Sequence, residues 1–436
     1  MMLEEEKSPI KKVLQNSAVL LSGDVGSNIF KLLTLAILSQ SQGAEKLGYY
    51  VLFLSIIEGI DRVFNFQTWH AFIKFAAIFQ ANKERQNILM LLKYSFLVDL
   101  VSLIVACSVA LLTSKFFISF FNIPEEYYTS LLLLCSTIFF KILDISTGIF
   151  RLFNKFKVQA KIALYTSAIR LVLYALVTLF SSSFEMFIYA TVLTQFISMI
   201  MKYFFVKSVL DNQKIKVSDV FNQKINIPLF KELKVFSFIV YNNFDSALRL
   251  LTTQLDVFLL GKLYGSELVG VYKITKETSK IVMKISSPVY QSIYPEFSKL
   301  IATKEFGLAK KMAFKVSKYA GLMGLLFYVS FYIFGKQLIG LVFGIELIEA
   351  YYVSLVYIFA VIINLISLPL PPLMHAMGLA NKSFYNQFIS SILYSSILYF
   401  LIIHNSIYGA AVSMIIFHLL WLTGSCIIIN NHKYLK

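Results

Sequence analysis

The stretches "GAEKLGYY" at Gly43–Tyr50 and "GSELVGVY" at Gly265–Tyr272 share the pattern Gly-x-Glu-x-x-Gly-x-Tyr, and the second lies 222 positions after the first. Three more pairs follow in the same order: "FNI" at 121 with "FGI" at 343, "YYTSL" at 127 with "YYVSL" at 351, and "LFNK" at 152 with "LANK" at 379. Four matches at a nearly constant offset indicate that the 436-residue chain contains two copies of one structural unit.

The composition places both copies in a membrane. The chain is 58% hydrophobic and only 15% charged, whereas soluble domains carry about 25% charged residues. Twelve apolar stretches approach or exceed the ~20 residues that a helix needs to cross a bilayer, and none alternates with the period of a barrel strand. They span roughly 14–38, 47–73, 88–112, 128–150, 162–180, 184–206, 235–260, 268–298, 318–335, 350–377, 383–403 and 407–430. The sequence predicts an all-α, polytopic membrane protein with about 12 transmembrane helices in two six-helix bundles.

The basic residues of the loops predict the orientation. One alternate set of loops, which includes both termini, holds 27 Lys and Arg residues, and the other set holds four. Because basic loops stay in the cytoplasm, both termini are expected there. Corresponding loops of the two copies then lie on the same side, which makes the repeat parallel. We expect an N-terminal bundle over 1–210, a cytoplasmic linker over 211–230 and a C-terminal bundle over 231–436.

Several function classes are disfavoured. The net charge of +16 is spread over loops, which argues against a nucleic-acid partner and points to membrane lipids. The three cysteines fall inside predicted spans, and the five histidines lack metal-ligand spacing, so neither a disulfide framework nor a metal or other cofactor is expected. No Gly-x-x-x-x-Gly-Lys-Ser/Thr motif for ATP is present.

Charged residues inside the spans are the candidate binding residues, because charges at bilayer depth normally face a wet cavity or a partner. Within 268–298, four lysines recur at three- and four-residue spacing and therefore share one helical face. Such a stripe requires an anion against it, although a lysine near a span end, such as Lys273, can instead extend to the interface. The candidates for a cationic, substrate-binding cavity are Lys31, Arg62, Arg249, Lys273, Lys276, Lys280 and Lys284.

Carboxylates and prolines in the spans suggest two further roles. Coupling to an ion gradient would need a carboxylate in the membrane, and the candidates are Asp24, Glu58, Asp61 and Asp256. Arg249 could also form a structural pair with Asp245, four residues before it. Prolines bend helices and are candidate hinges, with a static kink as the alternative. The hinge candidates are Pro288, Pro295, Pro369, Pro371 and Pro372.

The chain resembles the bacterial polysaccharide flippases of the multidrug/oligosaccharidyl-lipid/polysaccharide exporter superfamily. The resemblance is carried by the parallel six-plus-six helices, by "LDVFLLGKLYGSELVGVYKITKETSKIVMKISSPVYQSIYPEFSKL" from Leu255 and by "HAMGLANKSFYNQF" from His375. It implies two lobes in a V around a central cavity, and an undecaprenyl-pyrophosphate-linked oligosaccharide, such as an O-antigen unit, moved to the outer leaflet of the cytoplasmic membrane. The resemblance also implies that the protein acts together with a polysaccharide polymerase and with chain-length machinery. Members of this superfamily also carry cations on helices 1, 2, 7 and 8. The resemblance therefore implies binding roles for the cations at these places in this chain, which are Lys31, Arg62, Arg249 and Lys280.

Two other functions are considered. A drug or organic-cation antiporter of the same superfamily should have a net acidic cavity, whereas the spans carry nine cations against eight anions. A membrane polymerase needs a catalytic site on a sizeable external loop, and the predicted external loops are short. The sequence therefore favours a transporter that is not an enzyme, with the antiporter as its alternative.

Overall fold

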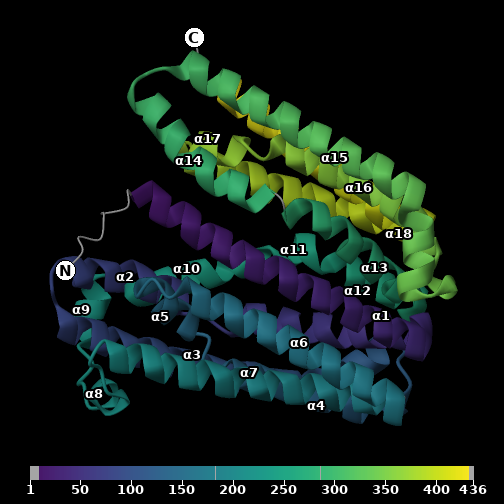
Figure 1. Cartoon of the computed structure of the whole chain (residues 1–436), viewed down its shortest axis with the longest axis horizontal. Helices are drawn as coiled ribbons and strands as arrows, with labels where there is room; N and C mark the ends of the chain where they lie inside the picture. Colours follow the sequence, from purple (N-terminus) through teal and green to yellow (C-terminus); the bar gives the residue numbers. More distant parts are fainter. Residues whose placement is uncertain (1–8, 182, 285, 432–436) are drawn as a thin grey trace, which may run out of the picture. The chain divides into compact units, whose positions relative to one another are not determined.

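The structure is a computed structural model that describes residues 9–181, 183–284 and 286–431. All regular elements in these ranges are helices (Figure 1). The α-helices are α1 (Pro9–Phe64), α2 (Trp69–Ala81), α3 (Arg85–Phe120), α4 (Tyr128–Cys135), α5 (Ser146–Leu152), α6 (Phe156–Phe180), α7 (Phe184–Asn212), α8 (Val217–Phe221), α9 (Ile227–Glu232), α10 (Val235–Leu248), α11 (Leu250–Thr253), α12 (Leu255–Tyr264), α13 (Ser266–Lys284), α14 (Ser286–Ala302), α15 (Phe306–Phe343), α16 (Glu349–Ser367), α17 (Leu370–Ala376) and α18 (Ala380–Asn430). Short 3-10 helices are η1 (Glu125–Tyr127), η2 (Ser136–Lys141) and η3 (Ile345–Leu347).

The internal repeat is visible in the backbone. Gly43, the first residue of one motif, has φ 77° and interrupts α1, and Gly265, its counterpart, has φ 86° and separates α12 from α13. Further along, Asn122 (φ 52°) follows α3 and Gly344 (φ 100°) follows α15. Glycine, and to a lesser degree asparagine, tolerates positive φ. The repeated sequence motifs therefore form turns at equivalent positions in the two copies.

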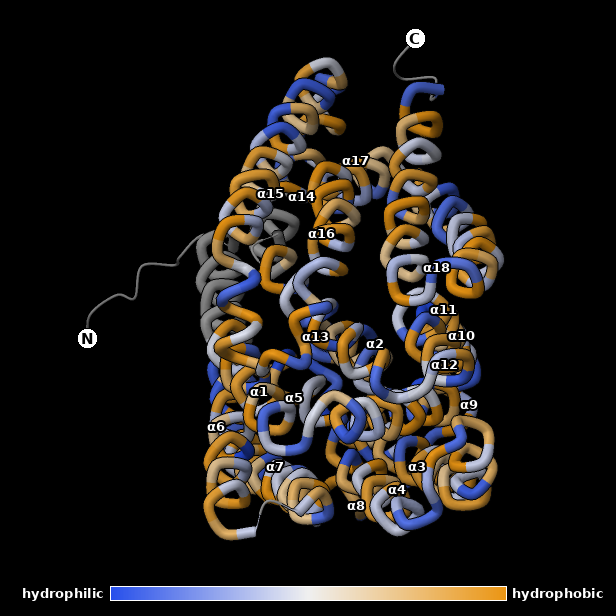
Figure 2. Tube along the Cα trace, turned by 90° about the vertical axis from the view of Figure 1, so that its right-hand side faces the viewer, coloured by the Kyte–Doolittle hydropathy of each residue, from blue (hydrophilic) through white to orange (hydrophobic). Residues whose placement is uncertain are grey.

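The long helices have the length and surface of membrane spans. Seven helical stretches among the described residues are long and apolar enough to cross a bilayer: Arg85–Phe120, Glu125–Leu152, Phe156–Phe180, Phe184–Asn212, Phe306–Phe343, Ile345–Ala376 and Ala380–Asn430. In the most apolar windows of α6 and α15 only 17% of the residues are buried. In Figure 2 apolar positions recur along the length of α15, α16 and α18. Apolar side chains that face outward over such lengths suit a lipid environment, and the chain is a polytopic membrane protein.

Two helices each contain a pair of predicted spans. The break at Gly43 lies between the predicted spans 14–38 and 47–73 of α1. In α18, Ser406 with φ 50° lies between the predicted spans 383–403 and 407–430. The total of twelve crossings stays a prediction.

Some predicted spans are wrong as continuous helices. The span 47–73 is interrupted between Phe64 and Trp69, and 235–260 is divided into α10, α11 and α12. The span 268–298 is divided into α13 and α14, and 350–377 into α16 and α17. Pro369 explains the last division, because proline lacks the N–H that continues a helix. Long-range hydrogen bonds hold the first interruption, as described below.

The chain folds into two compact units, each with its own core. One unit comprises residues 22–42 and 49–254, and the other comprises 1–21, 43–48 and 255–436. In the first, aromatic residues such as Phe72, Phe79 and Phe150 pack between α2, α3, α5 and α7. In the second, Phe297 and Met374 belong to a core built from α14, α15, α17 and α18. The predicted boundaries at 210 and 231 stay predictions.

Candidate functional site

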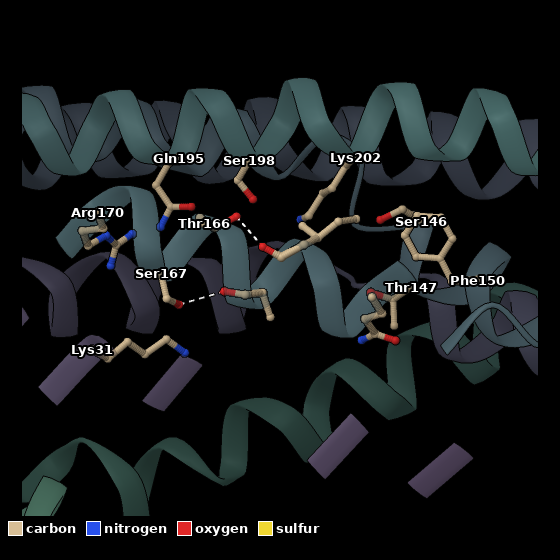
Figure 3. A pocket seen from close by; sticks show the side chains of 13 residues that line it. Lys31, Ser146, Thr147, Phe150, Thr166, Ser167, Arg170, Gln195, Ser198 and Lys202 are labelled. Carbon is tan, nitrogen blue, oxygen red and sulfur yellow. Dashed lines mark hydrogen bonds between the residues drawn. The ribbon is translucent and has the colours of Figure 1, made fainter. Parts of the chain in front are cut away.

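A polar cavity lies inside the first unit, between α1, α5, α6 and α7. Its volume is about 340 Å³. Figure 3 shows Lys31 reaching in from α1, Arg170 from α6, and Gln195 and Lys202 from α7. The cavity thus gathers three cationic side chains from three helices, and one of them, Lys31, is a residue that the sequence predicted as a substrate-binding cation.

The described residues that line this cavity include three cationic side chains and no carboxylate. Lys202 Nζ lies 2.5 Å from Asp144 Oδ1, which neutralises one cation. The ion pairs recorded in the described part of the chain include no carboxylate on Arg170. Within a low-dielectric surrounding, an excess of positive charge attracts an anionic ligand strongly.

Among the residues that the structure describes, two buried polar atoms in the cavity wall have no hydrogen-bond partner. They are Arg170 Nε and Gln159 Oε1. Nearby hydroxyls are instead satisfied by their own helix: Thr166 Oγ1 donates to the Ile162 carbonyl at 2.7 Å and Ser167 Oγ to that of Ala163 at 2.8 Å. Because buried polar groups are normally paired, unpaired ones beside a cavity indicate a place for a polar ligand.

Helical periodicity explains how α6 and α7 form this wall. On α7, Gln195, Ser198 and Lys202 are spaced at i, i+3 and i+7, which places them on one face. The sequence alone predicts no role for Arg170, and it places Lys202 in a cytoplasmic loop. The polar spacing that leads from Gln195 to Lys202 was the signal that could have identified this face.

In the second unit, α12 and α13 carry a buried ion pair. Lys276 Nζ lies 2.7 Å from Asp256 Oδ2, and the side chains are 8% and 0% exposed. Tyr272 donates its hydroxyl to the same oxygen at 2.9 Å. The predicted binding cation Lys276 and the predicted coupling carboxylate Asp256 are therefore partners of each other.

Glu277 supplies an anion for two other lysines of α13. Its Oε1 lies 3.0 Å from Lys273 Nζ and 2.8 Å from Lys280 Nζ. The four lysines were expected to repel one another unless an anion lay against them, and Glu277 provides part of that compensation within the same helix.

The remaining predicted charges of the first unit form separate pairs. Arg62 Nη2 lies 2.6 Å from Glu58 Oε1, and Gln254 donates to the other oxygen of Glu58 at 2.6 Å. Asp61 binds Lys141 at 2.6 Å. The expected structural pair of Arg249 with Asp245 is present at 2.9 Å, with Arg249 67% exposed. None of these residues lines the cavity of Figure 3.

Of the candidate hinges, three prolines are placed at the start of α17. Pro369 caps the helix, and Pro371 and Pro372 follow in its first turn, where a missing N–H is tolerated. The side chains of Asp24, Lys284, Pro288 and Pro295 lie outside the described part of the structure.

Comparisons with known proteins concern the family and the fold of the chain. The model of the family described as "Polysaccharide biosynthesis protein" matches residues 13–301. The "Inner membrane protein YghQ" of Escherichia coli (strain K12) is 23% identical over 347 residues, which cover 78% of this chain and 95% of that protein. An inward-facing multidrug resistance MATE family transporter of the MOP superfamily superposes with a TM-score of 0.76 at 13% identity, covering 95% and 98% of the two chains. Lipid II flippase MurJ, in an inward closed conformation, superposes with a TM-score of 0.70 at 12% identity, covering 95% and 88%. The two structural likenesses show a shared fold.

Proposed function

Because the chain belongs to the polysaccharide biosynthesis protein family, we propose that it is a transporter that flips undecaprenyl-pyrophosphate-linked oligosaccharides across the cytoplasmic membrane. The units move from the inner to the outer leaflet by alternating access and supply surface polysaccharide synthesis. The name of the Escherichia coli relative, an inner membrane protein, and that of the structural neighbour, a lipid II flippase, support this location and this class of cargo.

The observation that carries the proposal is the cationic cavity of the first unit. A pyrophosphate is a compact anion with several acceptor oxygens, and Arg170 can donate to it in a forked geometry. Lys31 adds a second cation, while Gln159 and Gln195 offer amide groups of the kind that bind sugar hydroxyls. The lining thus fits a charged linkage with a sugar attached to it.

The same lining disfavours organic cations. Their transporter would need carboxylates at the cavity, whereas this one presents Lys31, Arg170 and Lys202. The structural likeness to a multidrug transporter, at 13% identity, concerns the fold. The antiporter is therefore the less favoured alternative.

The other predicted residues keep their proposed roles. Arg62, Arg249, Lys273, Lys276, Lys280 and Lys284 remain candidates for binding the anionic headgroup. Glu58, Asp61, Asp24 and Asp256 are candidates for ion coupling, and Pro288, Pro295, Pro369, Pro371 and Pro372 are candidate hinges. Both termini lie in the cytoplasm in this scheme, and a polymerase with its chain-length partners uses the product outside.

A complementation experiment tests the proposal. The gene is deleted in its host, and the lipid-linked intermediate is measured in each leaflet. Plasmids then supply the wild type, the double variant Lys31→Ala, Arg170→Ala, or Lys157→Ala, which removes an exposed cation from the same helix as Arg170. We expect the intermediate to accumulate on the cytoplasmic side, and only the wild type and Lys157→Ala to clear it. Normal polysaccharide without the gene, together with new sensitivity to cationic drugs, would contradict the flippase.

A further inference from the structure

The interruption between α1 and α2 is held in place by one face of α3. Within this interruption, the Phe66 N–H donates to Ser102 Oγ at 3.4 Å, and the Thr68 N–H donates to Asp99 Oδ1 at 3.0 Å. Thr68 Oγ1 also donates to the Ser95 carbonyl at 3.4 Å. Ser95, Asp99 and Ser102 are spaced at i, i+4 and i+7, so they lie along one side of α3. The side chains of Asp99 and Ser102 thus accept from two backbone N–H groups of the interruption.

Asp99 is only half satisfied by this arrangement. The residue is 2% exposed, and its Oδ2 atom has no hydrogen-bond partner among the described residues. One turn earlier on α3, the buried Ser95 Oγ also lacks a partner. An ionised carboxylate buried without a counter-charge is costly, and such a group usually becomes neutral instead.

The charged and titratable groups of the neighbouring elements are engaged elsewhere. The elements packed against α3 are α2, α4, η2 and α8. On α2, His70 stacks on Trp69, and Lys74 lies over the rings of Phe75 and Phe238.

The other neighbours leave Asp99 without a counter-charge as well. On η2, Lys141 binds Asp61, and on α8, Asp219 accepts from the Lys216 N–H. On α3 itself, Lys93 donates to the carbonyls of Phe221 and Gln223. Asp144, which follows η2, is paired with Lys202. Tyr128 and Cys135, on α4, bring no positive charge.

We propose that Asp99 binds a proton in this conformation and is a further site, beside the candidate carboxylates named above, where proton movement is coupled to transport. A proton needs no added volume, whereas an oxygen-binding metal cation such as Ca²⁺ or Mg²⁺ takes about six oxygen ligands. Only two partnerless oxygens, Asp99 Oδ2 and Ser95 Oγ, lie on this face of α3 among the described residues. The neutral acid can keep the oxygen that accepts from the Thr68 N–H, and it carries no charge that needs a counter-ion.

Loss of the proton would create a buried negative charge on α3. This charge is stabilised only if water or a cation reaches Asp99. Such access requires α2 and the interruption to move away from α3. The proton would thus stabilise one position of the interrupted helix and its release would favour the other. This coupling rests on the proposed transport function, but the bound proton itself does not.

Infrared difference spectroscopy on the purified full-length protein tests the bound proton directly. At a pH where exposed carboxylates are ionised, the wild type should show the carbonyl stretch of a neutral carboxylic acid, which shifts in deuterated water. Asp99→Asn should remove the band, Asp99→Glu should move it, and Asp219→Asn, at a half-buried position of α8, should leave it intact. Absence of the band from the wild type, or its persistence in Asp99→Asn, would overturn the proposal.

A second measurement separates the proton site from the cargo. Vesicles that contain the protein and a lipid-linked oligosaccharide are given a pH gradient, and flipping is followed. We expect the gradient to change the wild-type rate several-fold, and the rate of Asp99→Asn to be insensitive to it. If the band is present but no lipid-linked sugar is flipped, the proposed function fails and the proton site stands. If Asp99→Asn responds to the gradient as the wild type does, the coupling role is contradicted.

Discussion

Gly48 packs so closely against the backbone carbonyl of Ser266 that a Cβ atom on Gly48 would overlap it. Gly270 meets the carbonyl of Ala44 in the same way. Ala44 and Ser266 occupy equivalent positions in the two Gly-x-Glu-x-x-Gly-x-Tyr motifs, as do Gly48 and Gly270. The contact is therefore reciprocal, as in a two-fold symmetric interface. The second glycine of each motif is required by this close approach of two backbones.

Substitution of either glycine should destabilise the protein. Gly48→Ala and Gly270→Ala force a backbone shift, and overpacking of this kind typically costs about 1–3 kcal/mol. Thermal unfolding in detergent should show a lowered Tm for both variants. Gly307→Ala is the matched control, because nothing lies within 4 Å of a Cβ there. Equal Tm values for Gly48→Ala and Gly307→Ala would show that the backbones do not approach so closely.

Gln159 should lower the stability of the folded protein and favour transport. Its buried, unpartnered Oε1 is a cost to the folded state, so Gln159→Met should unfold at the same or a higher temperature than the wild type. If the cavity receives a sugar headgroup, the same variant should flip its substrate several-fold more slowly. The two readouts are the Tm and the rate of flipping in vesicles. A lower Tm with normal flipping would assign Gln159 a purely structural role.

The buried pair of Lys276 and Asp256 should be sensitive to the loss of one partner. Lys276→Met leaves an uncompensated charge on Asp256, and breaking a buried pair costs about 3–5 kcal/mol. The double variant Lys276→Met, Asp256→Leu should recover most of this loss. Arg249→Met serves as a comparison, because its exposed pair is worth about 0–1 kcal/mol. Denaturant unfolding gives the free energy of unfolding of each variant. If Lys276→Met loses no more stability than Arg249→Met, the pair of Lys276 and Asp256 is not buried as the structure shows it.

Pro369 should matter for motion more than for folding. Pro369→Ala restores an N–H at the junction of α16 and α17 and lets the two helices join. We expect an unchanged or raised Tm and slower flipping. Pro124→Ala, in the turn before η1, is the control and should alter neither quantity strongly. Unimpaired flipping by Pro369→Ala would show that Pro369 forms a static kink and not a hinge.

The fold was largely predictable because its signals are local. The apolar stretches and the spacing of Gly43 and Gly265 can be read directly from the sequence. The structure confirms the helical class and the repeated turns. The interruption at 65–68 was not predictable in the same way. It contains neither proline nor glycine, and Gln67 adopts φ 44° there. Asp99 and Ser102, more than thirty residues away, supply the hydrogen bonds that replace the helix.

The candidate site was less predictable than the fold. Lys31 was found because a cation inside an apolar span is conspicuous. The sequence places Lys202 in a loop because the residue lies near the end of a span, where a cation can extend to the membrane interface. Which cations share a cavity depends on how α1, α6 and α7 pack, and that information is carried by the tertiary structure and not by spacing within one helix.

Flipping by the purified protein in liposomes tests the central claim most directly. Vesicles would contain a polyprenyl-pyrophosphate-linked oligosaccharide, or the same sugar on an uncharged lipid, and a membrane-impermeant reagent would report the sugar in the outer leaflet. The account predicts rapid flipping of the pyrophosphate lipid by the wild type, little flipping of the uncharged lipid, and at least a tenfold slower rate for Lys31→Ala, Arg170→Ala. Equal flipping of both lipids, or a double variant as fast as the wild type, would contradict a cationic cavity that recognises the charged linkage.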